Sequence, residues 1–399
     1  MELETARDLL TPLLPKNPTV RIPLADSFGR LLAEPIIAAL DFPPFDRSPL
    51  DGYAVRSADI QGASAAAPKT LIQTDNIPAG TFSTKPVCPG EAARIMTGAP
   101  LPPGADGVVR LEDTNLVDDI VTIYTDQQAA KNICRRGEEI HSGETLLTPG
   151  TYINEGVLGL LALVGQTQPL VYTKPRIGLL ATGSELVPPE APLTPGKIRD
   201  TNSFMLAGKI LKCGGEPHLL GLVPDRLEAI IESLETAPPL PIYLTTGGAS
   251  VGDYDLMEQL FQHFKIPILF NRLDIKPGMP VIAGLWKNSL LIALSGNPAA
   301  SSVSFEVLLR PLIQKLAGFS CWEHQRSLVT LNSEFTKPSP TRRFVWARCY
   351  NHNGRMYADP LSSQGNGMLK AAASANALLD IPPNTPALTP GMQFEALLL

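Results

Sequence analysis

The sequence predicts a multidomain chain of the α/β plus β class. It combines a central three-layer α/β domain with a parallel-type sheet, an inserted small β-module and a C-terminal β-barrel-like domain. Residues 176–318 alternate strand-like and helix-like stretches, which is the pattern of a parallel sheet with helices on both faces. Residues 42–125, and those from 325 onward, carry short β-type runs broken by proline and glycine, as in small all-β modules.

The N-terminal region is expected to begin with a helix over residues 3–14. After the β-module, an apolar helix is predicted from 155 to 164 and a strand from 169 to 173. We expect these pieces to pack with the N-terminal region, which makes the β-module an insertion. The predicted domains are a linking domain (1–41 and 137–173), the inserted β-module (42–136), the α/β domain (174–320) and the C-terminal β-domain (321–399).

The α/β domain is expected to follow a regular order along the chain. Strands are predicted at 177–181, 217–223, 242–246, 267–270 and 290–294, and helices near 201–213, 225–235, 255–264 and 299–317. In the C-terminal domain, strands are predicted near 327–333, 343–350, 354–358, 377–381 and 393–398.

Composition excludes several classes of protein. The formal net charge is −6, and no basic tract interleaves with aromatic residues, so a nucleic-acid partner is not expected. No apolar run approaches the roughly 18 residues of a membrane span. The N-terminus does not resemble a signal peptide, so we expect a cytoplasmic protein. The five cysteines and five histidines are scattered, so any metal is expected to be a hard cation held by carboxylates.

Three apolar runs end in turns of small residues before a helix-like stretch, at 177–185, 242–253 and 291–298. Open α/β sheets bind ligands at the carboxyl ends of parallel strands, and these three ends are expected to share one edge. Glycine and helix N-termini allow close approach to a phosphate. We therefore expect a phosphorylated small molecule to be bound here by Thr182, Gly183, Ser184, Gly247, Gly248, Ser250, Ser295, Gly296, Asn297 and Pro298.

Charged residues near these turns suggest a metal and a counter-charge. Asp253 and Asp255 close the glycine-rich second turn, and two carboxylates beside bound phosphate are suited to Mg²⁺. Glu185 follows the first turn. Lys276 and Arg272 are candidates to balance phosphate or oxyanion charge, although a turn lysine is more often solvated.

Other polar residues have structural explanations that the sequence alone favours. Asp225 follows Val-Pro and precedes a helix, which is typical of an N-cap. Asp51 stands in an Asp-Gly turn before a strand, and Thr97 ends a strand in a Thr-Gly turn. The cluster from Lys131 to Arg136 resembles a solvated surface.

Together these segments resemble the molybdopterin molybdenumtransferase family, the MoeA proteins and the E domain of gephyrin, over nearly the whole chain. The motifs that carry the resemblance are 48–55 (SPLDGYAV), 95–99 (IMTGA), 104–109 (GADGVV), 135–138 (RRGE), 182–186 (TGSEL), 200–202 (DTN), 247–255 (GGASVGDYD), 275–278 (IKPG) and 295–298 (SGNP).

The resemblance implies the last step of molybdenum cofactor biosynthesis. Adenylylated molybdopterin and molybdate would react with Mg²⁺ to give molybdenum cofactor and AMP. It also implies an elongated homodimer in which the β-module of one subunit faces the α/β domain of the other. A molybdopterin adenylyltransferase is a possible delivery partner. The resemblance assigns catalytic roles to Asp51, Thr97, Glu185, Asp225, Asp255 and Lys276, substrate binding to Arg136 and Pro298, and metal binding to Glu185 and Asp255.

The chain departs from the family pattern at three places. Met279 replaces the last lysine of Lys-Pro-Gly-Lys-Pro, Ser295 replaces the first proline of Pro-Gly-Asn-Pro, and Asn366 replaces the serine of Gln-Gly-Ser. Loss of a lysine predicts weaker molybdate binding, unless Arg342 or Arg343 compensates. Two alternatives remain open: a molybdopterin adenylyltransferase, which would release pyrophosphate, and a cofactor-binding scaffold without turnover.

Overall fold

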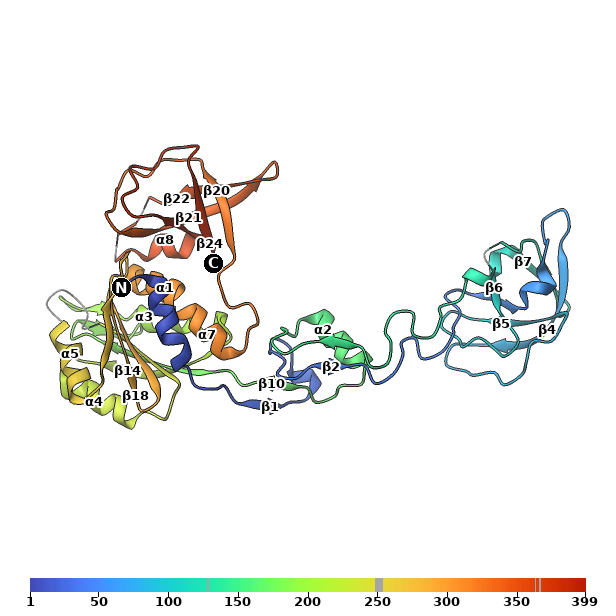
Figure 1. The fold of residues 1–399 in the computed structure, drawn as a ribbon, viewed down its shortest axis with the longest axis horizontal. Helices are drawn as coiled ribbons and strands as arrows, with labels where there is room; N and C mark the ends of the chain where they lie inside the picture. The colour runs from blue at the N-terminus through green and yellow to red at the C-terminus, as the bar shows by residue number, and fades with distance from the viewer. Residues whose placement is uncertain (128, 248–253, 363, 366) are drawn as a thin grey trace. The chain divides into compact units, whose positions relative to one another are not determined.

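The computed structural model describes residues 1–127, 129–247, 254–362, 364–365 and 367–399, with only the backbone of residues 254 and 255. The chain separates into two compact units (Figure 1). One unit contains 1–34, 149–158 and 168–399, and the other contains 35–148 and 159–167. The predicted α/β plus β class is confirmed, whereas the four domain boundaries remain a prediction. No described helix is long and apolar enough to cross a membrane.

The smaller unit is built on a sheet of order β6-β3-β5-β4-β8-β7. Its strands are β3 (Gly52–Val55), β4 (Lys69–Ile77), β5 (Glu91–Ile95), β6 (Gly107–Arg110), β7 (Thr114–Val117) and β8 (Ile120–Ile123). The same unit also contains a separate two-stranded sheet formed by β2 (Ile36–Ile37) and β9 (Thr145–Leu147). Tyr53 and Val55 pack into one core and Ala54 into another, because side chains alternate across a strand. Both faces are covered, so β3 is apolar throughout.

The N-terminal helix is shorter than the sequence predicts. α1 (Leu3–Leu10) ends in a 3₁₀ turn at Thr11–Leu13, where Pro12 lacks the N–H that would continue the helix. Its buried residues Leu3, Ala6 and Leu10 join the core of the α/β domain. Further along lie β1 (Thr19–Arg21), α2 (Glu155–Leu163) and β10 (Leu170–Tyr172), with β1 and β10 antiparallel.

The central sheet has the order β14-β11-β15-β19-β18-β16. Its strands are β11 (Arg176–Thr182), β14 (Glu216–Val223), β15 (Ile242–Thr246), β16 (Ile268–Arg272), β18 (Pro280–Trp286) and β19 (Ser289–Leu294). β14, β11, β15 and β19 are mutually parallel, as predicted. β18 was not predicted. It forms an antiparallel hairpin with β19 through Lys287 and Asn288, both at positive φ, without the Asn-Gly pair that usually marks such a turn.

Helices cover both faces of this sheet. They are α3 (Asn202–Lys212), α4 (Leu227–Thr236), α5 (Tyr254–His263), α6 (Pro298–Ser304) and α7 (Arg310–Ala317). Leu179 packs into the core that contains residues of α3 and α7, while the adjacent Leu180 packs into the core that contains residues of α4 and α5. The predicted three-layer arrangement is therefore present.

The helix predicted over 299–317 is interrupted by a π-helical segment, Phe305–Leu309. Arg7 of α1 donates from Nε to the carbonyl of Val307 at 2.7 Å. Glu306 is buried in an ion cluster with Lys209, Arg310 (3.4 Å) and His324 (3.5 Å). Burial alone would raise the pKa of Glu306, but the hydrogen bond from His324 and the charge of Lys209 outweigh it and lower the pKa to about 2.

Replacing Glu306 with glutamine is expected to lower the free energy of unfolding by about 3–5 kcal/mol, because Lys209 and Arg310 lose their buried counter-charge. The folded-state pKa lies below the ordinary value of 4.5. The stabilisation is therefore present above pH 4.5 and is lost as the pH falls toward about 2. Urea unfolding followed by the fluorescence of Trp286, Trp322 and Trp346 checks this, since all three lie in the larger unit.

The matched control for this substitution is Glu232→Gln on the exposed side of α4. We expect it to change the unfolding free energy by less than about 0.5 kcal/mol. Equal stability of the Glu306→Gln variant and the wild type at pH 7 would contradict a stabilising role for the cluster.

The C-terminal domain is a closed five-stranded barrel. Its strands are β20 (Arg326–Leu331), β21 (Arg342–His352), β22 (Arg355–Pro360), β23 (Ala377–Ile381) and β24 (Gln393–Leu398), and pairing of β21 with β23 closes the ring. The five strands agree with the sequence prediction, but α8 (Leu369–Ser374) was not predicted. β17 (Ile275–Lys276) of the α/β domain adds to the barrel beside β21.

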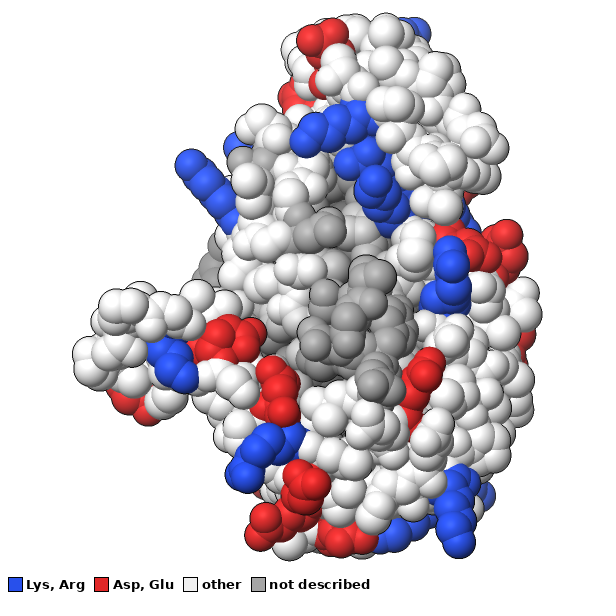
Figure 2. Space-filling view, turned by 90° about the vertical axis from the view of Figure 1, so that its left-hand side faces the viewer, with Lys and Arg blue, Asp and Glu red and all other residues white. Residues whose placement is uncertain are grey.

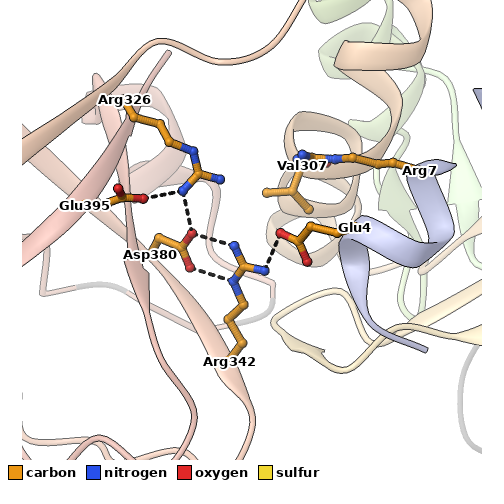
Figure 3. A network of polar contacts seen from close by, with 7 residues as sticks. All are labelled: Glu4, Arg7, Val307, Arg326, Arg342, Asp380 and Glu395. Atoms are coloured by element: carbon orange, nitrogen blue, oxygen red, sulfur yellow. Dashed lines mark hydrogen bonds and ion pairs between the residues drawn. The ribbon is translucent and has the colours of Figure 1, made fainter.

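A polar network joins α1 to the barrel (Figure 3). Arg342 donates from Nε and Nη2 to the two carboxylate oxygens of Asp380, at 2.7 and 2.6 Å, and from Nη1 to Glu4 at 2.7 Å. Arg326 contacts the same Asp380 at 3.2 Å and also Glu395. Hydrogen bonds to Asp380 and Glu4 raise the pKa of Arg342 despite its partial burial. The network therefore fixes α1 against the barrel.

Candidate functional site

A cleft of about 650 Å³ lies at the carboxyl ends of the parallel strands. In the sheet register, Thr182 is paired with Val223, Ala181 with Thr246, and Thr246 with Leu294, so these strand ends meet at one edge as predicted. The described lining residues are Thr182, Glu185, Leu186, Leu193, Ile198, Arg199, Asp200, Thr201, Asn202, Asp225, Thr246, Gly247, Ser295, Gly296, Asn297, Pro298, Gly367 and Leu369.

The first turn is fastened to the turn that follows β14. The backbone N–H of Ser184 donates to the carboxylate of Asp225 at 3.2 Å, and the N–H of Asp225 donates to Ser184 Oγ at 3.3 Å. Asp225 does not cap α4, because Arg226 occupies the N-cap position and makes no side-chain cap. The interpretation of Asp225 as an N-cap is therefore wrong, and its exposed carboxylate lies on the cleft instead.

The second turn begins at Gly247, where the backbone takes φ +101°. A Cβ at this position would lie 2.0 Å from the carbonyl oxygen of Thr182, so the two strand ends approach closely only because residue 247 is glycine. Thr182 Oγ1 is buried and has no hydrogen-bond partner in the described structure. Buried polar groups normally have a hydrogen-bond partner, so this hydroxyl is a notable exception within the described part of the chain.

The third turn is held by side chains of its neighbours. Ser295 Oγ accepts a hydrogen bond from the N–H of Asn297 at 3.2 Å. Asn202, at the start of α3, donates from Nδ2 to the carbonyl of Gly296 at 2.9 Å. Asp200 accepts from the N–H of Ser203 at 3.1 Å and lines the same cleft. The α3 end and the third turn therefore form one connected wall.

Three carboxylates, Glu185, Asp200 and Asp225, line the cleft. The described residues contain no group of three or more His, Cys, Asp or Glu side chains close enough to hold a metal by themselves. Mg²⁺ is usually held by one or two carboxylates together with substrate phosphates, so this set of oxygen donors fits Mg²⁺. Gly248, Ser250 and Asp253 lie outside the described residues. Asp255 is the second residue of α5, and its side chain also lies outside them.

Neither of the two predicted cations, Arg272 and Lys276, is among the described residues that line this cleft. Arg272 ends β16, 3.9 Å from Asp274. Lys276 is exposed in β17, in register with Arg343 of β21. The face shown in Figure 2 carries both basic and acidic side chains.

The arginines proposed to compensate for Met279 have other partners. Arg343 is buried, donates to the carbonyl of Lys337 at 2.9 Å and lies over the Phe335 ring. Arg342 is engaged by Asp380 and Glu4, as described above. Neither belongs to the described lining of the cleft. Asn366, the third departure, lies outside the described residues.

The smaller unit holds the other predicted site residues. Asp51 accepts hydrogen bonds from the N–H and the hydroxyl of Thr97, both at 2.8 Å, and these bonds lower its pKa. Arg136 forms an ion pair with Asp41 at 2.6 Å. The fold therefore brings Asp51 and Thr97 together, as the family resemblance implies. The guanidinium of Arg136 is already paired with the carboxylate of Asp41.

Several lining residues were not among the predicted site residues. Leu193, Ile198 and Arg199 come from the proline-rich segment after the first turn, and Gly367 and Leu369 come from the C-terminal domain. β12 (Leu186–Val187) and β13 (Ile198–Arg199) pair in parallel at the base of that segment. These two-residue strands carry no periodic signal, so the sequence offered little to find them.

Comparison with known proteins places the geometry in context. The chain matches the MoeA N-terminal region (domain I and II) over residues 1–165, the probable molybdopterin binding domain over 178–315 and the MoeA C-terminal region (domain IV) over 329–399. Molybdopterin molybdenumtransferase of Bacillus subtilis (strain 168) is 36% identical over 383 residues, 95% of this chain and 89% of that protein. The protein of the same name from Staphylococcus epidermidis (strain ATCC 12228 / FDA PCI 1200) is 37% identical over 367 residues, 92% of this chain and 88% of that protein.

A solved structure is also similar over the full length. The crystal structure of the molybdopterin biosynthesis MoeA protein from Pyrococcus horikoshii OT3 gives a TM-score of 0.85 at 29% identity, covering 100% of both chains. That similarity extends from the N-terminal helix to the C-terminal barrel.

Proposed function

The chain belongs to the molybdopterin molybdenumtransferase family, and on that premise we propose that it transfers molybdenum from molybdate to adenylylated molybdopterin and releases AMP. Water cleaves the phosphoanhydride bond between molybdopterin and AMP, which leaves AMP and the phosphate of molybdopterin. The two dithiolene thiols displace one oxo group of molybdate, which departs as water, so that both sulfurs bind the molybdenum. The protein is thus a transferase of molybdenum cofactor biosynthesis.

The observation that carries this proposal is the cleft at the strand ends. It combines small-residue turns, which admit a phosphate, with carboxylates suited to a hard cation. Its volume of about 650 Å³ lies within the usual range for small-molecule sites. A phosphorylated ligand accompanied by Mg²⁺ therefore matches the chemistry of the lining.

Each part of the cleft has a proposed role. The turns at Thr182, Gly247 and Ser295 bind phosphate oxygens, and Glu185 and Asp255 hold Mg²⁺. Bound Mg²⁺ supplies Lewis-acid stabilisation of charge on the phosphoanhydride oxygens. The remaining proposed binding residues at the turns are Gly183, Ser184, Gly248, Ser250, Gly296, Asn297 and Pro298, and Asp225 keeps its proposed catalytic role. Arg272 and Lys276 are not among the described residues that line the cleft, so their proposed roles in binding and catalysis rest on the family resemblance.

We further propose that a homodimer completes the site. Asp51, Thr97 and Arg136 all belong to the smaller unit. We propose that a second subunit contributes these three residues to the site. The exposed, ionised carboxylate of Asp51 is held in a fixed orientation by Thr97, which supports a direct role. The molybdopterin adenylyltransferase remains the proposed delivery partner.

Two incubations test the function against its alternatives. With adenylylated molybdopterin, molybdate and Mg²⁺, AMP release is expected, together with protein-dependent formation of molybdenum cofactor. With ATP and molybdopterin, no pyrophosphate release is expected. Pyrophosphate in the second incubation would indicate an adenylyltransferase, and tight binding without AMP in the first would indicate a scaffold.

Restoring the family lysine is expected to strengthen molybdate binding. Met279→Lys adds a cation to the turn that follows Lys276, and we expect molybdate affinity to rise by about threefold to tenfold, as for a partly solvated charge pair. Calorimetric titration with molybdate measures the change, and Met279→Gln is the neutral control. Equal affinities in the wild type and the lysine variant would reject the idea that Met279 weakens binding.

A further inference from the structure

The cleft has an unusual balance of charge for a site that binds phosphate. Glu185, Asp200 and Asp225 contribute three carboxylates. Among the described residues that line the cleft, Arg199 is the one lysine or arginine. Phosphate binding among carboxylates requires positive charge in contact with the ligand, because the like charges otherwise repel, and Arg199 can supply it in addition to the proposed Mg²⁺.

The backbone of Arg199 is held firmly beside the first turn. Arg199 pairs with Val187 between β13 and β12. The N–H of Ile198 donates to the carbonyl of Glu185 at 2.9 Å, and the N–H of Asp200 donates to the carbonyl of Val187 at 2.8 Å. These bonds on both sides fix where the arginine side chain starts relative to Glu185.

The guanidinium of Arg199 is available for a ligand. It is exposed, and its one contact in the described structure is a long hydrogen bond to the carbonyl of Ala191, at 3.5 Å. Among the described residues, no carboxylate lies within 4.0 Å of it. Arg136 and Arg342, by contrast, are already held in ion pairs.

The same segment places apolar side chains next to this cation. Leu193 and Ile198 both line the cleft, yet they are 53% and 56% exposed. Apolar side chains in a cleft that is otherwise lined by polar groups are suited to covering one face of a planar ring. The segment therefore offers contacts for a ring and for the phosphate attached to it.

We propose that Arg199 binds a phosphate of the adenylylated substrate, and that Leu193 and Ile198 contact its adenine ring. The proposal rests on the function proposed above and names the group that recognises its substrate. Arginine is suited to the task because its planar guanidinium donates two parallel hydrogen bonds to phosphate oxygens.

The proposal is tested by AMP binding to the full-length protein, measured by calorimetry. Arg199→Gln is expected to weaken AMP binding by about tenfold to a hundredfold, the effect of losing hydrogen bonds from a charged group. Arg199→Lys should recover part of this loss, since it keeps the charge but not the paired donors. Adenosine, which lacks the phosphate, should bind the wild type and Arg199→Gln equally in competition with a fluorescent adenosine analogue.

Two further variants serve as controls, one for the loss of a positive charge and one for the contact with the ring. Arg348→Gln removes one exposed arginine from β21, away from the cleft lining, and should leave AMP affinity unchanged. Leu193→Ala should weaken AMP and adenosine by the same factor, because it acts on the ring alone. Thermal unfolding of each variant should match that of the wild type, because the side chains of Leu193, Arg199 and Arg348 are all exposed.

The outcomes distinguish the two proposals. If the wild type binds AMP and converts adenylylated molybdopterin, but Arg199→Gln binds AMP as tightly, the assignment of Arg199 fails and the proposed function stands. Equal losses of AMP and adenosine affinity in Arg199→Gln would also overturn the phosphate assignment. If the wild type neither binds AMP nor releases it from adenylylated molybdopterin, both proposals fail.

Discussion

Replacing Glu185 with glutamine is expected to reduce AMP formation by about a hundredfold or more at saturating substrate, the scale for loss of one strong electrostatic contact in a transition state. Glu185 follows the first turn, and its carboxylate folds back over that turn: a Cβ at Gly183 would lie 3.0 Å from Glu185 Oε2. Glutamine preserves the shape but removes the charge that we propose holds Mg²⁺. The Mg²⁺ concentration for half-maximal rate should rise as well.

The matched control is Glu190→Gln, an exposed carboxylate a few residues further on that is outside the cleft lining. It changes net charge equally and is expected to leave turnover within about twofold. Rates are measured as AMP released over a range of Mg²⁺ concentrations. If Glu185→Gln turns over as fast as the wild type at every Mg²⁺ concentration, Glu185 is not part of the reaction site.

Replacing Gly247 with alanine is expected to destabilise the larger unit by at least about 3 kcal/mol and to abolish turnover. An L-residue at φ +101° costs roughly 1–2 kcal/mol, and the added Cβ would overlap the Thr182 carbonyl oxygen 2.0 Å away. The two strand ends must then separate, which deforms the part of the cleft where both turns lie.

The Gly221→Ala variant separates the cost of backbone strain at positive φ from the cost of steric overlap with Thr182. Gly221 has a similar φ of +107°, but no atom lies within 4 Å of the position its Cβ would take. Its replacement should cost only the backbone strain, roughly 1–2 kcal/mol, with turnover retained. Urea unfolding and AMP release are measured on both variants. Equal behaviour of the two would show that the close approach to Thr182 is unimportant.

The strand-to-turn junctions were predictable because a buried parallel strand is apolar throughout and ends at glycine or serine. That pattern placed Thr182, Gly247 and Ser295 on one edge, and the register of β11, β15 and β19 confirms the edge. The barrel strands, which pair mostly antiparallel, were predictable from a different local pattern, namely short β-type runs broken by proline and glycine. Resemblance to the family added Asp51 and Thr97, which local patterns assign to turns.

Other features depend on contacts between distant segments, so local patterns could not predict them. The π-helical segment lies where Arg7 contacts Val307 and where Glu306 meets Lys209 and His324, contacts that span up to 300 residues. Residues Gly367 and Leu369 reach the cleft only because the barrel packs beside the α/β domain. Arg199 was missed because two-residue strands, rather than a motif, bring it to the first turn.

The most direct test of the account is AMP release from adenylylated molybdopterin by the purified protein. We expect one AMP for each molybdenum atom incorporated, with release that requires Mg²⁺ and increases with molybdate until it saturates. The reaction should stop when Mg²⁺ is removed by a chelator and resume when it is restored. If the folded protein releases no AMP at any combination of molybdate and Mg²⁺ concentrations, the proposed molybdenum transfer is wrong.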